Sequence, residues 1–173
     1  VDVPLKKIGT TNKTGTKVRF MPDNTIFSTT NFSFTTISER MQQSAFLLKG
    51  LTIDVIDLED GRENHFCYQD GIKEFVSYLN QDKNSLHNVV YFEGDKDSIH
   101  MQIAFQYTDS YTESFFSYVN NIPTSEGGTH ETGFKIGFTK AMNDIARKHN
   151  LLKDKEDNLL GEDYREGMSA VLS

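Results

Sequence analysis

The sequence predicts a domain of the α+β class, or a split α/β sandwich, in which strands and helices are mixed along the chain. Segments with alternating apolar residues, typical of strands, are interspersed with segments whose apolar residues recur every three or four positions, typical of helices. The chain has 173 residues, of which 36% are hydrophobic and 12% aromatic. This length and composition suffice for a real core, which we expect to be rich in phenylalanine.

The longest predicted element is one helix of about 20 residues within the stretch Asn120–Leu152. Pro123 and the pair Gly127-Gly128 precede it as turn residues, and Thr129 is the expected N-cap. On a helical wheel, the apolar residues that share one side are Phe134, Phe138, Ala141, Met142 and Ile145. Lys140, Asn143 and Arg147 lie opposite, together with Ile136, so we expect a core face and a partly basic outer face.

Shorter elements are predicted on both sides of this helix. The expected strands are Thr14–Met21, Leu51–Leu58, Glu63–Tyr68, Val89–Phe92, Ile99–Tyr107, Glu113–Asn120 and Met168–Leu172. Further helical segments are expected from Thr36 to Gly50, from Gly71 to Leu79 and over Gly161–Gly167. The turns that connect strands are expected at Asp60-Gly61 and at Gly94–Asp97.

Composition argues against several classes of function. The net charge of −7 disfavours a tight, non-specific DNA-binding module. The single cysteine, Cys67, excludes an internal disulfide framework and fits a reducing compartment. The histidines lack metal-ligand spacing, so no metal site is expected. Neither a membrane-spanning run nor a signal peptide is expected.

Catalytic motifs are not evident in the sequence, and two features remain open between a structural and a binding role. Asp57, Glu59 and Asp60 flank a hairpin turn, which favours a solvated turn over a catalytic pair of carboxylates. The turn residues Gly127, Gly128, Thr129 and His130 either bind an anion at the helix N-terminus or simply allow close packing. The face formed by Lys140, Asn143 and Arg147 either contacts phosphates or is solvated.

Several segments of the chain resemble segments of a known protein family and occur in the same order. They are GTKVRFMPDNTIF, AFLLKGLTIDVID, FCYQDGIKEFVSYLN, YFEGDKDSI, SYVNNIPTSEGGTHETG and GEDYREGMSAVLS. Together with the helix GFKIGFTKAMNDIARKHNLL, they resemble the ATPase subunit of bacterial type IIA DNA topoisomerases, which comprise gyrase and topoisomerase IV. The segments AFLLKGL and GGTHETG are more similar to topoisomerase IV of Gram-positive bacteria than to gyrase.

The resemblance implies a fold and a mechanical role. Residues 1–23 would be a connector and the last strand of an ATP-binding domain, and residues 24–173 a transducer domain that is cut within its final strand. The family fold is a two-layer sandwich of a mixed sheet and helices with a left-handed β-α-β crossover, like the second domain of a ribosomal protein. Such transducers relay the ATP-driven closure of a dimer, and their inner walls line a cavity for the transported DNA duplex.

The same resemblance implies which partners and cofactors belong to the longer protein. ATP and magnesium would bind to motifs before Val1 and to a lysine loop after Ser173, so no catalytic, cofactor-binding or metal-binding residue is carried onto this chain, which alone is expected to be inactive. The implied partners are duplex DNA, the DNA-cleaving A-type subunit and a second ATPase subunit, in the cytoplasm of a bacterium. Lys140, Asn143 and Arg147 are the residues expected to face the DNA cavity.

Two alternatives stay open beside this interpretation. The chain could be a self-standing binding module of the same fold that takes a ligand at the Gly127-Gly128 turn. It could also belong to another ATPase–transducer family, such as the chaperone or mismatch-repair branches.

Overall fold

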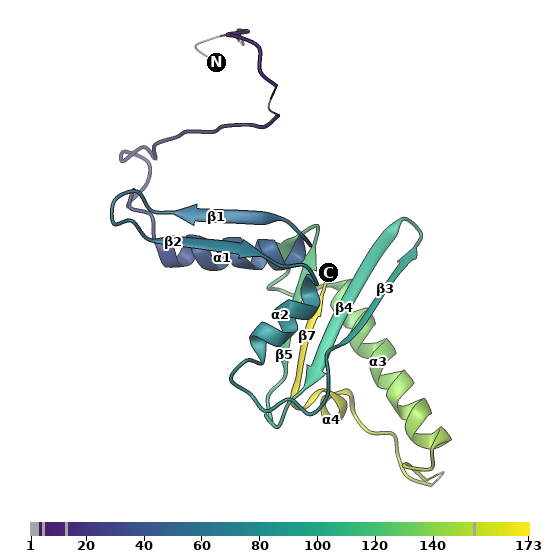
Figure 1. The fold of residues 1–173 in the computed structure, drawn as a ribbon. Coiled ribbons are helices and arrows are strands. Elements are labelled where there is room, and N and C mark those ends of the chain that lie inside the picture. The colour runs from purple at the N-terminus through teal and green to yellow at the C-terminus, as the bar shows by residue number, and fades with distance from the viewer. Residues whose placement is uncertain (1–3, 5, 13, 154) are drawn as a thin grey trace. The chain divides into compact units, whose positions relative to one another are not determined.

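The computed structural model describes residues 4, 6–12, 14–153 and 155–173. They form two compact units, Val1–Ser33 and Phe34–Ser173. Figure 1 shows the whole trace, in which the first unit is the purple end of the chain and the second carries the labelled helices and strands.

The first unit is extended and contains no helix or strand among its described residues. The strand expected over Thr14–Met21 does not form, and the side chains of Val18, Phe20 and Met21 are 78%, 73% and 89% exposed. A strand needs a neighbour to bond its N–H and C=O groups, and the described part of this unit offers no second strand. The chain then turns at Asp23, whose carboxylate accepts a hydrogen bond of 2.8 Å from the Thr25 amide.

The second unit contains all the regular elements of the described residues. The helices are α1 (Phe34–Leu47), α2 (Ile72–Leu79), α3 (Thr129–Lys148) and α4 (Gly161–Arg165). The strands are β1 (Thr52–Ile56), β2 (Glu63–Cys67), β3 (Val90–Lys96), β4 (Ile99–Tyr107), β5 (Ser114–Val119), β6 (Ile122–Pro123) and β7 (Met168–Leu172). The α+β class expected from the sequence is therefore confirmed.

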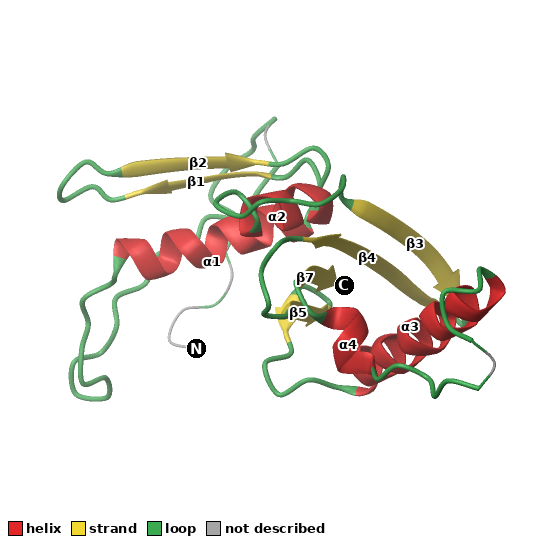
Figure 2. Cartoon of the chain, turned by 90° about the horizontal axis from the view of Figure 1, so that it is seen from below, coloured by secondary structure: helices red, strands yellow, loops and turns green. Residues whose placement is uncertain are grey.

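Helix α1 lies along the β1–β2 hairpin, as both views show (Figures 1 and 2). The strands are antiparallel, and Ile53 lies opposite Phe66. Gly61 has a φ of 77°, which is the left-handed conformation that a tight hairpin needs and that glycine adopts without strain. The prediction of a hairpin turn at Asp60-Gly61 is confirmed.

The main sheet has the strand order β3-β4-β7-β5-β6. Its centre is β7, which pairs antiparallel with β4 and parallel with β5. Because β5 and β7 are parallel neighbours, the chain between them must cross over the sheet, and α3 makes this crossover. The left-handed sense that the resemblance implies for it stays a prediction.

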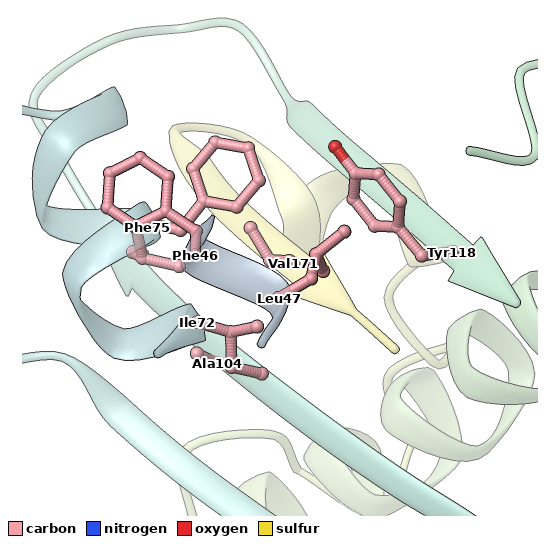
Figure 3. Close-up of a cluster of buried hydrophobic side chains, with 8 residues drawn as sticks. Phe46, Leu47, Ile72, Phe75, Ala104, Tyr118 and Val171 are labelled. Carbon is pink, nitrogen blue, oxygen red and sulfur yellow. The ribbon is translucent and has the colours of Figure 1, made fainter. Parts of the chain in front are cut away.

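Two apolar clusters lie on opposite faces of the sheet. Figure 3 shows the first cluster, where Phe46 of α1 and Ile72 and Phe75 of α2 meet Ala104 and Val171 of the sheet. The ring centroids of Phe46 and Phe75 are 4.8 Å apart. On a strand, successive side chains point to opposite faces, so the neighbours of Ala104 and Val171 point the other way.

Side chains that point to this other face form the second cluster, against which Phe134 and Phe138 of α3 pack. Its buried residues are Ile103, Phe105, Met168, Ala170 and Leu172. Helices therefore cover both faces of the central strands. The reason is that β7 is apolar on both faces and each face needs a cover.

The turns of the main sheet depart from expectation. The turn between β3 and β4 is at Asp97-Ser98, with φ values of 50° and 65°, whereas Gly94 lies within β3 opposite Met101. Asn120 and Asn121 form a similar turn, with φ values of 50° and 64°, and lead into the short strand β6 that the sequence did not predict. Two-residue hairpin turns of type I′ have two consecutive left-handed residues, and Asn and Asp tolerate this conformation better than most side chains.

The backbone at Gly167 leaves no space for a side chain. Its φ is 72°, and a Cβ there would lie 2.5 Å from the carbonyl oxygen of Ser110 and 2.7 Å from that of Thr108. Gly167→Ala should therefore lower the free energy of unfolding by about 2 kcal/mol or more, measured by urea denaturation.

The matched control is Gly137→Ala in the interior of α3, where a Cβ meets nothing within 4 Å. It should raise the free energy of unfolding by about 0.5–1 kcal/mol, because alanine favours the helix more than glycine. Equal effects of the two substitutions would contradict the close approach at Gly167.

Candidate functional site

Helix α3 carries the residues that the sequence analysis singled out, and aromatic contacts fix its position. The rings of Phe134 and Phe115 have centroids 5.6 Å apart, and so do those of Phe138 and Phe105. Its observed length of 20 residues agrees with the prediction. The expected core face is confirmed at Phe134 and Phe138, but Ile145 is 50% exposed.

The four consecutive residues of the helix N-terminal turn, Gly127 to His130, lead into α3. Gly127 has a φ of 74°, and its amide donates a 2.8 Å hydrogen bond to the carbonyl of Thr124. A Cβ on Gly128 would lie 2.7 Å from the ring of His130, so a larger residue there would displace this ring. The N-cap is Gly128, and Thr129 is the first helical residue, which corrects the expectation that Thr129 caps the helix.

Side chains of the protein already occupy the N-terminus of α3. The imidazole Nε2 of His130 lies 3.1 Å from the hydroxyl of Thr124. The carboxylate of Glu131 accepts a hydrogen bond of 2.9 Å from the hydroxyl of Ser117. This carboxylate supplies the negative charge that the helix N-terminus favours, and it would repel an incoming anion. The geometry thus favours a packing role for the Gly127-Gly128 turn.

A chain of alternating charges joins α3, the residue before β5 and α4. The ammonium nitrogen of Lys135 lies 2.8 Å from a carboxylate oxygen of Glu131 and 3.3 Å from a carboxylate oxygen of Glu113. The Nε–H of Arg165 donates to both carboxylate oxygens of Glu113, at 3.2 and 3.1 Å. Sequence spacing reveals only the Glu131–Lys135 pair, which is one helical turn apart. The contacts of Glu113 span a long sequence separation and have no local signal.

These ion pairs shift two pKa values. The hydrogen bond from Lys135 holds the pKa of Glu131 below its usual value, against the effect of burial, and the Ser117 hydroxyl adds to this. Burial acts to lower the pKa of Lys135, but its hydrogen bond with Glu131 and its interactions with Glu113 outweigh burial and raise it. Both shifts stabilise the charged forms.

Asn143 was expected on the outer face of α3, and the structure corrects this. Its side chain is 4% exposed and makes hydrogen bonds on both ends of the amide. The Nδ2 group donates to the carbonyls of Thr139 and Leu159, at 3.1 and 3.0 Å. The Oδ1 atom accepts from the Leu159 amide at 3.0 Å and from the Tyr164 hydroxyl at 3.2 Å. Asn143 therefore anchors the segment that leads to α4.

Arg147, one turn further along α3, holds the same segment. Its guanidinium donates to the carbonyls of Lys153 and Glu156, at 3.0 and 2.8 Å, and to the side-chain oxygen of Asn158, at 3.1 and 2.7 Å. Of the three residues expected on a DNA-facing surface, two are thus engaged in structure. Lys140 is exposed, and the ion pairs found among the described residues do not include it.

The described residues contain no group of three or more His, Cys, Asp and Glu side chains arranged to hold a metal ion. Within the same residues, no helix has the length and apolar character needed to cross a membrane.

Comparison with known proteins identifies the family. The family model described as DNA gyrase B matches residues 71–173, which include β3 to β7, α3 and α4. This chain belongs to the DNA gyrase B family. The resemblance found in the sequence is thereby confirmed.

Two curated relatives are bacterial DNA topoisomerase 4 subunits B. The protein of Streptococcus pneumoniae is 55% identical over 171 residues, which are 98% of this chain and 26% of that protein. The protein of Enterococcus faecalis is 55% identical over 172 residues, which are 98% of this chain and 25% of that protein. The chain thus spans about a quarter of the length of the curated relatives it matches.

Among solved structures, the 43K ATPase domain of Thermus thermophilus gyrase B, in complex with an aminocoumarin, has a similar fold. The TM-score is 0.75 and the identity 32%, over 88% of this chain and 42% of that one. The mixed sheet with packed helices therefore agrees with the fold of this gyrase B family member.

The hydrogen bonds of Asn143 are expected to stabilise the fold. Asn143→Ala leaves the amide and carbonyl of Leu159 without their partner, so the free energy of unfolding should fall by about 3 kcal/mol in urea denaturation. Lys140→Ala, on the same helix and exposed, is the control and should change it by about 0.5 kcal/mol or less. A similar small change in both variants would show that the Asn143 contacts contribute little.

The lowered pKa of Glu131 predicts an acid-dependent loss of stability. A group whose pKa is lower in the folded state stabilises the fold above its unfolded pKa, which is 4.5 for this glutamate, and loses that contribution as the pH falls through the folded value. The difference in free energy of unfolding between the native chain and Glu131→Gln should be constant near neutral pH and shrink at acid pH. Glu126→Gln, in the same turn, is the control. A difference that stays constant down to about pH 3 would refute the shift.

Proposed function

We propose that this chain is the transducer part of the ATP-hydrolysing subunit of a bacterial type II DNA topoisomerase. The match to the 43K ATPase domain of gyrase B carries the proposal, because this chain corresponds to 42% of that domain's structure. A mechanical role is supported by the ion pairs that join α3 to Glu113 before β5 and, through Glu113, to Arg165 of α4. ATP and magnesium would then act in other parts of the longer protein.

In this proposal, residues 1–23 are a connector and the last strand of the ATP-binding domain, and residues 24–173 are the transducer. The exposed side chains of Val18, Phe20 and Met21 support it, because an apolar strand of this kind is stable when a neighbouring sheet covers it. The observed division into compact units comes later, after Ser33.

The proposed role of α3 is to carry the closure of the ATP-bound dimer through the transducer. The ion pairs of Lys135 and Glu113 fasten its first half to β5 and α4, and the hydrogen bonds of Asn143 and Arg147 fasten its second half to the segment before α4. A helix fastened at both halves moves as one body with its surroundings. The implied partners are a second ATPase subunit, the DNA-cleaving A-type subunit and duplex DNA.

For the DNA cavity, we assign the direct contact to Lys140. Its ammonium group is exposed, whereas Asn143 and Arg147 shape the surface beside it through their contacts with the segment that follows α3. The overall charge of −7 keeps such a contact weak, which suits a cavity that must release the duplex.

The domain proposal predicts fast amide exchange in the first unit. The amides of residues 16–20 have no strand partner among the described residues, so in dilute solution they should exchange far faster than the amides of Ile103 and Val171 in the central strands. Hydrogen–deuterium exchange followed by NMR measures both sets. Protection of residues 16–20 at the level of β7 would argue against their belonging to a sheet that another domain supplies.

The DNA contact predicts a change in the coupling between DNA and ATP hydrolysis. In the complete subunit assembled with its DNA-cleaving partner, Lys140→Glu should lower the ratio of DNA-stimulated to basal ATPase rate by about threefold at low salt, and less at high salt. Lys96→Glu, at the tip of the β3–β4 hairpin, makes the same charge change elsewhere and should keep the ratio. If the two variants behave alike, Lys140 has no special contact with DNA.

A further inference from the structure

A pocket of about 400 Å³ lies between α3 and the segment that runs from Asn158 into α4. Its walls include Ile136, Thr139, Lys140 and Asp144 from α3, and Leu159 and Arg165 from the facing segment. It combines apolar side chains with cationic groups, and the ion pairs and packing described above do not fill it.

The guanidinium of Arg165 is well placed to serve a ligand in this pocket. Its side chain is 12% exposed, and its hydrogen bonds within the described residues leave from Nε, toward Glu113. The carboxylate thus fixes one edge of the guanidinium, and the terminal nitrogens retain their donors. A planar pair of such donors fits two oxygens of one phosphate.

Gly161 makes room for this arrangement. A Cβ at this position would lie 2.5 Å from the terminal nitrogen NH1 of Arg165 and 2.7 Å from the hydroxyl oxygen of Thr139. The absence of a side chain on Gly161 therefore lets both groups reach the same wall of the pocket.

The charges around the pocket indicate a weak anion site. Lys135 is matched by Glu131 and Glu113, whereas Lys140 has no carboxylate within ion-pair distance in the described part of the chain. Asp144 also lines the pocket and opposes an anion. An anion would thus be attracted by Lys140 and by the terminal N–H groups of Arg165, whose charge Glu113 partly balances, and repelled by Asp144.

We propose that this pocket seats one backbone phosphate of duplex DNA, an inference that rests on the proposed function. The terminal nitrogens of Arg165 and the ammonium of Lys140 would donate to the phosphate oxygens. Ile136 and Leu159, which are 66% and 44% exposed, would pack against the adjoining sugar. Free inorganic phosphate has the same oxygen atoms as a backbone phosphate. We assign the site to the phosphate of the DNA backbone.

The test is an NMR titration of the isotope-labelled chain with a 20-base-pair duplex and, separately, with inorganic phosphate. The duplex should shift the signals of the Arg165 Nε–H and of the Thr139, Lys140 and Leu159 amides. Lys140→Gln should weaken duplex binding about threefold and lower the slope of log K against log salt by about one. Asp144→Asn should strengthen binding about threefold, because it removes a repelling charge.

Two further variants separate the pocket from a diffuse basic surface. Lys148→Gln removes a charge from the same helix outside the pocket and should change the affinity by about twofold at most. Gly161→Ala keeps every charge but displaces the Arg165 guanidinium, and it should weaken binding as Lys140→Gln does. Equal losses for Lys140→Gln and Lys148→Gln, or no gain with Asp144→Asn, would overturn the proposal.

The outcomes also separate this proposal from the proposed function. If the duplex shifts other signals of α3 but none in the pocket, the pocket proposal is wrong and the role of α3 beside DNA remains. If inorganic phosphate shifts the pocket signals and the duplex does not, the DNA assignment is wrong. If the pocket binds the duplex as expected while Lys140→Glu leaves the ATPase coupling of the complete enzyme intact, the fault lies with the proposed function.

Discussion

The burial of β7 on both faces is the constraint on which the rest of the second unit depends. Each of its five residues is buried, and the strand pairs with β4 on one edge and β5 on the other. A strand of this kind needs an apolar cover above and below, which α2 with the end of α1 provides on one face and α3 on the other. Because β5 and β7 are parallel, the connection between them has to be long, and the helix in that connection becomes the cover of the second face.

Helix α3 therefore has two tasks, and its polar residues serve the second. Phe134 and Phe138 close the core. Lys135 reaches Glu113 before β5, and Asn143 and Arg147 both reach the segment before α4. Buried or half-buried polar groups are stable when all their hydrogen-bonding capacity is used, and the amide of Asn143 meets this condition with four partners. The helix thereby joins the core, the charged chain around Glu113 and the segment before α4.

The sequence alone predicts those parts of this architecture that depend on local periodicity. The inner face of α2 is an example, because Ile72, Phe75 and Val76 follow helical spacing and all three are buried. The length of α3 and the hairpin turn at Gly61 are further cases. In each, the deciding interactions are local, or they need only a generic apolar surface opposite.

Other features depend on partners that are distant in the sequence. A wheel places Asn143 on a polar face, but it contains no information that Leu159 will fold back to bond both ends of its amide. The partner of Arg165 is likewise Glu113, although Asp163 and Glu166 are nearer in the sequence. The apolar pattern of residues 14–21 indicates a strand correctly only if a neighbouring strand exists, and local sequence does not supply one.

Helix α3 holds the segment that follows it mainly through that segment's backbone groups, which allows most of its side chains to vary among homologues. Arg147 bonds the carbonyls of Lys153 and Glu156, and Asn143 bonds the backbone of Leu159 on both sides. Backbone groups are the same for nearly every amino acid, so most positions of this segment are free to change their side chains without loosening it. Asn158 and Glu156, whose side chains take part, are the exceptions. We therefore expect relatives to differ widely in the charge and size of residues 153, 155 and 157 while keeping an asparagine and an arginine at the two helix positions that hold the segment.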